Sequence, residues 1–478
     1  MTLSSFDRVT LAGWDAVETA ARIRSNEVTA AEVVEAAIAR AEEARDLGGV
    51  VEPCYERARV NGASPDGAPW LGVPTFVKDV ARVAGVATTW GSLGSGRYVS
   101  KRSDPFVRSF ERLGVVVLGK SATSELGLMP ATEPLARPPC RNPWDVSRSS
   151  GGSSGGAACL VSAGVVPVAH GMDGGGSIRI PAACCGLVGF KPSRFRLDAM
   201  GSSTLPVNVV TDGILSRSVR DTVAFYVGLE SQRRPRRVPA VATSESQLRQ
   251  PLRMAVFVEA PARTPVDAEV RDAVLAAARL CQTLGHTVDP IPCPFDGGVT
   301  DDFLRYWGFL AWAQLKTARL ALHWHFDRSK LEPWSRGLAA TFARAKLRTI
   351  AAIWRLRRFS RAFATVTNRY DVLVFPTLAE PAPPLGALAG NRPFATTFER
   401  VRSYAAAFTP LANISGAPAI SLPMGRTATG LPIGVQFAAA HGHDRMLLDL
   451  ALALEAAQPW EPIAPRERWL ALAASASP

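Results

Sequence analysis

The sequence predicts an α/β fold in one large domain that spans residues 1–478. Short apolar runs typical of strands alternate with segments of helical periodicity along the chain. A hydrophobic content of 47% and a charged content of 20% are ordinary for a folded protein. No internal repeat divides the chain, although the composition shifts at residues 233–250. A single α/β domain with a helical insert at about 295–367 therefore fits better than separable domains.

The chain begins with predicted helices. Between residues 13 and 45, apolar residues recur at helical spacing. Thr29 is followed three positions later by Glu32, the pattern of a capping box. A helix is therefore expected to begin directly after Thr29.

Later segments alternate between the two kinds of element. Helices are expected at 268–284, over much of 301–367, and at 444–457. The segments that read as strands are GVPTFVKDV (72–80), GVVVLGK (114–120), LRMAVFVE (252–259), DVLVFPT (371–377), APAISLPMG (417–425) and LPIGVQFAA (431–439).

Charge and cysteine content bear on partners and location. Much of the net charge of +12 lies in RRPRR (233–237) and in a helix predicted for Ala343–Val366. We expect that helix to be a solvated face whose apolar side packs on the domain, with a membrane- or nucleic-acid-binding module as the alternative. No nucleic acid partner and no stable membrane anchoring are expected. Seven cysteines without CxxC pairs, and no signal-like start, favour the cytoplasm.

Two glycine-rich turns carry the strongest functional signal. GGSSGG occupies 151–156 and GMDGGGS occupies 171–177, and each contains serine. Glycine lets the backbone approach a ligand closely and leaves N–H groups free to face an anion. Serines on such turns suggest a nucleophile beside an oxyanion hole, and hence a hydrolase.

The general base is more plausibly lysine than histidine. His170 is the one histidine near the turns, and its apolar neighbours indicate a structural role at a strand end. Lys78 follows an apolar run, and burial would lower its pKa so that it could act as a neutral base. An ion pair with the adjacent Asp79 is the alternative.

Two other patterns are set aside. GVVVLGKS (114–121) satisfies the expression of a phosphate-binding loop, but strand formers fill the interval that should be a loop. The histidine pairs at 323–325 and 441–443 lack acidic or thiol neighbours, so no metal site is expected.

Lys78, GGSSGG and DGGGSIRIPA (173–182) together resemble the amidase signature family. Ser153 follows Lys78 by 75 positions and Ser177 follows Ser153 by 24, as in that family. The similarity extends to FTPLANISGAPAISLPMG and is closest to actinobacterial amidases and nylon-oligomer cyclic-dimer hydrolases. It implies a central mixed β-sheet covered by helices on both faces, with the signature core at about 70–230 and 365–460.

The resemblance also implies residue roles. Ser177 is the expected nucleophile, and Ser153, after a cis Gly152–Ser153 bond, bridges it to Lys78. Backbone N–H groups of residues 174–177 form the expected oxyanion hole, namely those of Gly174, Gly175, Gly176 and Ser177. Ser154, Asp173 and Arg179 are expected to hold the two turns in place. No cofactor and no metal are implied.

The predicted activity is hydrolysis of a small-molecule amide through an acyl-enzyme. A glutamine-hydrolysing subunit of a tRNA-dependent amidotransferase, or an esterase, is the alternative enzyme. Aryl or medium aliphatic acyl groups are expected in a pocket walled by residues 307–324, 125–135 and 407–415. A homodimer is the expected assembly of this chain.

Overall fold

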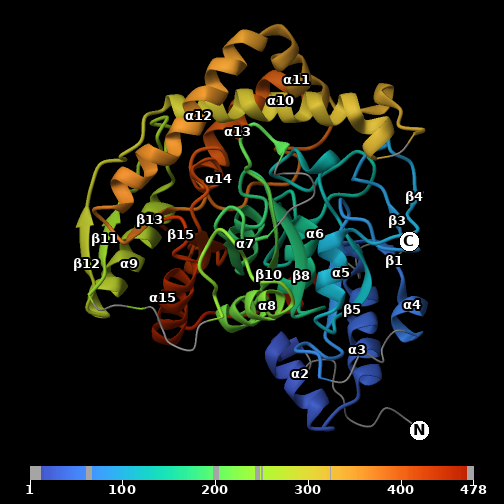
Figure 1. The fold of residues 1–478 in the computed structure, drawn as a ribbon. Coiled ribbons are helices and arrows are strands. Elements are labelled where there is room, and N and C mark those ends of the chain that lie inside the picture. Colours follow the sequence, from blue (N-terminus) through green and yellow to red (C-terminus); the bar gives the residue numbers. More distant parts are fainter. Residues whose placement is uncertain are drawn as a thin grey trace.

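The central sheet has eight strands and lies among helices (Figure 1). The computed structural model describes residues 12–60, 67–197, 204–242, 248, 251–322 and 324–470. The strand order is β12-β11-β13-β15-β14-β9-β10-β8. In chain order these strands are β8 (Val168–Asp173), β9 (Val188–Lys191), β10 (Thr211–Ser216), β11 (Arg253–Val256), β12 (Thr287–Pro290), β13 (Val372–Pro376), β14 (Ala419–Arg426) and β15 (Pro432–Ala439).

This sheet is mixed and buried on both faces. Strand β11 runs parallel to β12 and β13, whereas the other pairs are antiparallel. Along β13, Val372 and Val374 join one apolar cluster while Leu373 and Phe375 join the other, as the alternation of strand side chains requires. The predicted mixed sheet with helices on both faces is confirmed.

Helices divide between the two apolar clusters. One cluster includes residues of α6 (Gly155–Ser162), α7 (Arg179–Cys185) and α14 (Pro410–Ser415). The other includes residues of α5 (Pro105–Glu111), α8 (Val219–Gln232), α9 (Ala268–Thr283) and α15 (Asp444–Ala457). The remaining short elements are α4 (Tyr55–Val60), β3 (Ala87–Thr88), β4 (Tyr98–Val99), β6 (Arg141–Asn142), β7 (Asp145–Ser149) and α13 (Phe394–Tyr404).

A three-stranded sheet adjoins the end of the large one. Its order is β1 (Val50–Pro53), β5 (Val116–Ser121), β2 (Pro74–Lys78), and β2 runs parallel to β5. The Thr75 hydroxyl on β2 donates to the carbonyl of Val168 on β8 at 2.9 Å. This contact joins the two strands near the start of each.

Three helices form the upper edge of the molecule: α10 (Gly298–Ala321), α11 (Pro333–Arg344) and α12 (Lys346–Thr367) (Figure 1). The prediction of a single helix over Ala343–Val366 is wrong at its start. Ala345 has φ −136° and ψ 42° and separates α11 from α12. Because no glycine or proline marks this break, the sequence offered no local signal for it.

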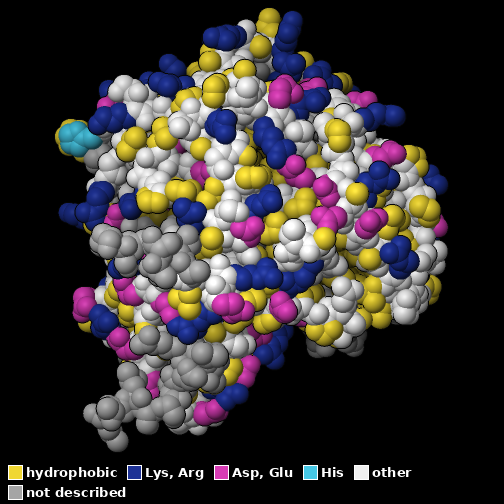
Figure 2. Space-filling model, turned by 180° about the vertical axis from the view of Figure 1, so that it is seen from behind, with side chains coloured by type: hydrophobic (Ala, Val, Ile, Leu, Met, Phe, Trp, Pro, Cys, Tyr) yellow, Lys and Arg dark blue, Asp and Glu magenta, His cyan; other side chains and the backbone are white. Residues whose placement is uncertain are grey.

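Helix α12 has one buried face and one exposed face. Ala352, Leu356 and Phe363 are buried, as expected for an apolar side that packs on the domain. Leu347, Ile350 and Trp354 are nevertheless exposed, by 82%, 62% and 58%. Figure 2 shows Lys and Arg side chains mixed with hydrophobic ones along this upper edge.

The helices at the two ends match the sequence closely. Helices α2 (Ala16–Arg24) and α3 (Ala30–Glu43) cover the first predicted segment. The Thr29 side chain and Glu32 form the predicted capping box. Helix α15 begins and ends at the predicted residues. In the described part of the chain, no helix has both the length and the apolar character to cross a membrane.

Candidate active site

The two glycine-rich turns meet at the end of β2. Ser153 and Ser154 lie between β7 and α6, and Ser177 lies between β8 and α7. Lys78 is the last residue of β2 and is 1% exposed. The Gly152–Ser153 peptide is cis, as the family resemblance implied.

Lys78 binds both serines of the first turn. Its Nζ donates to Ser153 Oγ at 2.7 Å and to Ser154 Oγ at 2.9 Å. A longer contact of 3.4 Å joins the Nζ to the carbonyl of Met172 on β8. The amine therefore touches both turns, and Ser154 contacts it as directly as Ser153 does.

The pKa of Lys78 suits a general base. Burial lowers this pKa from 10.5 to about 7, although the charges of Asp173 and Asp212 act in the opposite direction. A buried ammonium loses its hydration, so the neutral amine is favoured. The predicted burial of Lys78 is confirmed, and this burial lowers its pKa in the direction that the sequence predicts.

Asp79 does not pair with Lys78. Its carboxylate lies 3.0 Å from the Nζ of Lys120, and both side chains are buried. Lys120 also donates to Thr88 Oγ1 at 3.0 Å. Asp79 therefore pairs with Lys120 and not with Lys78. Most of GVVVLGKS forms the strand β5 (Val116–Ser121), so this segment is not a phosphate-binding loop.

His170 supports the lysine rather than the nucleophile. It lies within β8, and its Nδ1 accepts the backbone N–H of Lys78 at 3.3 Å. Its Nε2 is 3.1 Å from Asp212 Oδ1 on β10. The structural role predicted for His170 is confirmed.

Asp173 and Arg179 brace the second turn from inside the core. Both are fully buried, and the guanidinium binds both carboxylate oxygens at 3.0 Å. Burial alone would raise the pKa of Asp173, but the charge and hydrogen bonds of Arg179 and the amide of Asn413 hold it well below its usual range. Asp173 is therefore a fixed anion that anchors the turn.

Three residues far along the chain complete this network, and sequence reasoning gave them no such role. Arg179 Nη1 donates to the Thr409 carbonyl at 2.8 Å and to Gln436 Oε1 at 2.7 Å. Asn413 Nδ2 donates to Asp173 Oδ1 at 2.8 Å. Thr409 and Asn413 stand four positions apart in FTPLANISG, so polar residues at helical spacing inside an apolar stretch were the available signal.

The second turn offers fewer oxyanion donors than expected. The Gly176 N–H, which was expected to face the substrate, donates to Asp173 Oδ1 at 2.7 Å. Gly176 also has φ +123°, a conformation that favours glycine. Among the described residues, the N–H groups of Gly174, Gly175 and Ser177 make no such contact.

Ser177 opens onto an apolar pocket. The structure describes no hydrogen bond between Ser177 and Ser153 or Lys78, so the serine relay stays a prediction. Ser177 is 9% exposed. The other residues that line the pocket are Leu128, Met129, Pro130, Gly175, Ile180, Phe303, Leu304, Trp307, Val401, Ala405 and Ala406.

The pocket walls differ in part from those expected. Residues 128–130 and Trp307 lie within the predicted segments, whereas Trp324 is 70% exposed and lies outside the lining. The third wall comes from Val401, Ala405 and Ala406 instead of residues 407–415. The latter segment carries Thr409 and Asn413, which bind Arg179 and Asp173.

Aromatic side chains fill the space that side chains at 174 and 175 would need. A Cβ at position 174 would lie 3.1 Å from Trp307 Cη2, and one at 175 would lie 2.7 Å from Phe303 Cζ. The indole N–H of Trp307 donates to the Leu128 carbonyl at 3.0 Å. Glycine at 174 therefore lets Trp307 pack over the turn.

The remaining candidates form no metal centre in the described part of the chain. No group of three or more His, Cys, Asp or Glu residues gathers there to hold an ion. His323 lies outside the described residues, and His441 binds the Arg194 carbonyl. All seven cysteines are free thiols.

Comparison with known proteins identifies close relatives. A family model described as Amidase matches residues 32–448. A Mycobacterium leprae protein named amidase AmiC is 42% identical over 456 residues, which cover 93% of this chain and 95% of that protein. The 6-aminohexanoate-cyclic-dimer hydrolase of Pseudomonas sp. (strain NK87) is 33% identical over 475 residues, with the same two shares.

Two solved structures also match this chain. The structure of 6-aminohexanoate cyclic dimer hydrolase complexed with substrate matches with a TM-score of 0.86 and 30% identity, covering 95% of this chain and 99% of that one. A bacterial aryl acylamidase of the amidase signature family matches with a TM-score of 0.81 and 26% identity, covering 97% and 99%.

Proposed function

This chain belongs to the Amidase family and is a hydrolase of amide C–N bonds, and we propose that it works through a Ser177–Ser153–Lys78 relay. The observation that carries this proposal is the contact of 2.7 Å between the buried Lys78 amine and Ser153 Oγ. A lysine with a pKa of about 7 is neutral often enough at neutral pH to accept a proton.

The proposed reaction has two halves. Neutral Lys78 takes the proton of Ser153 as Ser153 takes that of Ser177, whose Oγ attacks the amide carbonyl. The backbone N–H groups of Gly174, Gly175 and Ser177 are the donors left to stabilise the oxyanion, at roughly 3 kcal/mol for each donor used. The proton then returns to the leaving amine, and water hydrolyses the acyl-enzyme by the reverse route.

The apolar pocket supports a substrate with an uncharged acyl group. Apart from Ser177, its lining side chains are apolar, and Phe303 and Trp307 stack with ring centroids 5.5 Å apart. Such a lining favours an uncharged, apolar acyl group and penalises the charges of free glutamine. The names of the two solved relatives, an aryl acylamidase and a cyclic-dimer hydrolase, agree with this substrate class.

We place the reaction in the cytoplasm. Seven free thiols, five of them buried, support a reducing compartment.

The test compares hydrolysis by Ser177→Ala with the wild type on a panel of anilides, aliphatic amides, esters and glutamine. Ser177→Ala should lose turnover and labelling by a fluorophosphonate, whereas Ser231→Ala, on the surface of α8, should keep both. Turnover of the amides by Ser177→Ala would overturn the proposed nucleophile. Glutamine turnover without turnover of the apolar amides would overturn the proposed substrate class.

The two serines beside Lys78 form a second, matched comparison. Ser153→Ala should lower kcat by roughly 10²–10⁴, because it interrupts the relay. Ser154→Ala removes a bond of similar length, 2.9 Å, without interrupting the relay, so its loss should be much smaller. Equal losses would show that Ser153 has no special part in proton transfer.

A further inference from the structure

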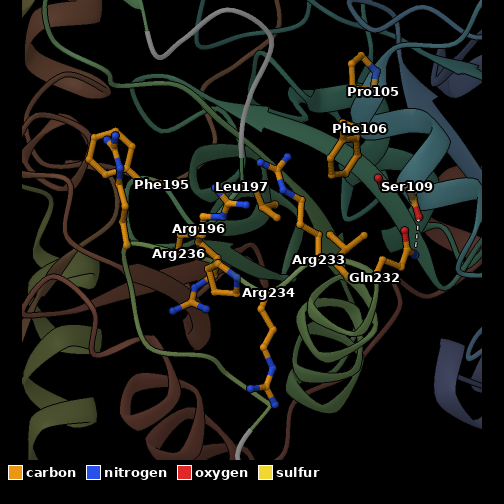
Figure 3. Close-up of a pocket in the computed structure, with 13 residues that line it drawn as sticks. Pro105, Phe106, Ser109, Phe195, Arg196, Leu197, Gln232, Arg233, Arg234 and Arg236 are labelled. Atoms are coloured by element: carbon orange, nitrogen blue, oxygen red, sulfur yellow. Dashed lines mark hydrogen bonds between the residues drawn. The ribbon is translucent and has the colours of Figure 1, made fainter.

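A second cavity lies away from Ser177 and is rich in arginine. It encloses about 360 Å³ between α5, α8 and the chain segments that follow Phe195 and Gln232 (Figure 3). Its lining residues are Pro105, Phe106, Ser109, Phe195, Arg196, Leu197, Leu229, Gln232, Arg233, Arg234, Pro235, Arg236 and Arg237. A volume of this size suits a small molecule.

The lining holds five arginines and no acidic residue. Arg196 is buried and neutralised, since it pairs with Glu230 and lies 2.8 Å from Asp444 Oδ1. Arg234 and Arg236 are exposed and form no ion pair with any residue that the structure describes. Arg196 is therefore neutralised by two acids that lie outside the lining, and the exposed Arg234 and Arg236 leave the cavity positively charged.

The residues of the lining suit a ligand that combines charged groups with a planar or apolar part. The guanidinium of Arg237 lies 4.7 Å from the centre of the Phe195 ring. Phe106, Leu197 and Leu229 supply apolar wall. In Figure 3, Arg233 extends towards Leu197 and Phe106. Pro235 restricts the backbone between the arginine pairs, so less freedom is lost when a ligand binds.

This cavity is separate from the catalytic site, although one ring adjoins both. Phe106 stacks on His170 with centroids 4.8 Å apart, and His170 accepts the N–H of Lys78. Arg234 and Arg236 contact none of the catalytic residues. Their replacement should therefore leave the hydrolytic site folded, and amide hydrolysis serves as a control.

We propose that this cavity binds a small oligophosphate, either inorganic or as part of a nucleotide. Guanidinium groups match phosphate oxygens in charge and in fork geometry. Several permanent positive charges near one another repel until a multiply charged anion neutralises them, which favours a triphosphate over a single carboxylate. The apolar wall beside Phe195 would accommodate the base of a nucleotide.

The experiment is isothermal titration calorimetry of the full chain with inorganic tripolyphosphate and, separately, with ATP. Both ligands should bind with Kd below about 1 mM at low salt, and more weakly as salt rises. The double variant Arg234→Gln/Arg236→Gln should raise Kd at least about tenfold while it retains amide hydrolysis. Tighter binding of ATP than of tripolyphosphate would identify a nucleotide as the ligand.

A matched variant separates a site from general charge. Arg358→Gln/Arg361→Gln removes the same charge from α12 and should change Kd by less than about twofold. The proposal is overturned if neither phosphate ligand binds at about 1 mM, or if both double variants weaken binding equally. It is also overturned if the Arg234/Arg236 variant binds as tightly as the wild type.

Discussion

Replacement of Lys78 by methionine should change stability with opposite signs at neutral and alkaline pH. Lys78 has a pKa of about 7 in the folded protein and 10.5 as its ordinary value. The folded protein binds the proton of Lys78 less tightly than the unfolded chain does. Folding with a protonated Lys78 therefore carries a free-energy cost, which is complete below pH 7. This cost falls as the pH rises towards 10.5, so Lys78 destabilises the fold by about 4 kcal/mol at pH 7 and about 1 kcal/mol at pH 10.

Methionine removes that cost together with the bonds of the amine. The Nζ donates to Ser153, Ser154 and the Met172 carbonyl. Three such bonds contribute about 1 kcal/mol each. The variant should then be more stable than the wild type by about 1 kcal/mol at pH 7 and less stable by about 2 kcal/mol at pH 10.

Urea unfolding of both proteins at the two pH values measures this difference. The change of about 3 kcal/mol between them depends on the pKa of Lys78 and not on the value given to each hydrogen bond. Lys120→Met is unsuitable as a control, because it would leave the buried Asp79 carboxylate without its cation. Lys346→Met, at the start of α12, is the control variant. A variant whose stability differs from the wild type by the same amount at both pH values would refute the lowered pKa.

Further predictions concern activity and packing. The kcat/KM of the wild type should fall about tenfold per pH unit below pH 7, because protonated Lys78 cannot accept a proton, and a profile flat from pH 5 to 8 would contradict its role as base. Gly174→Val should lower kcat/KM by at least about tenfold, because its side chain clashes with Trp307. Combining it with Trp307→Leu should recover about 1 kcal/mol in a double-mutant cycle. Strictly additive effects of the two substitutions would exclude the contact. Arg179→Met leaves its buried carboxylate partner charged and should cost about 3–5 kcal/mol in urea unfolding. Arg402→Met, whose partner Asp301 has a side chain that is 48% exposed, should cost less than about 1 kcal/mol. Similar losses in these two variants would contradict that difference in burial.

Local patterns predicted the elements well where short-range contacts decide the structure. The capping box at Thr29 involves residues three positions apart, and α15 has a continuous apolar face, so both could be predicted from neighbours in the sequence. The break at Ala345 could not. It divides α11 from α12, both of which pack on α10, and no residue there disfavours a helix.

The sequence alone determined the α/β fold, the two serine-bearing turns and the burial of Lys78, because apolar periodicity, glycine and the run before the lysine are all local. Only the tertiary structure decided how the buried charges pair. Lys120, 41 positions away, takes Asp79, and Gln436, 257 positions away, helps to hold Arg179. A buried charge accepts whichever partner the packing brings within reach, and that choice is made by contacts between distant segments. For the same reason the third wall of the pocket comes from α13 and the residues after it.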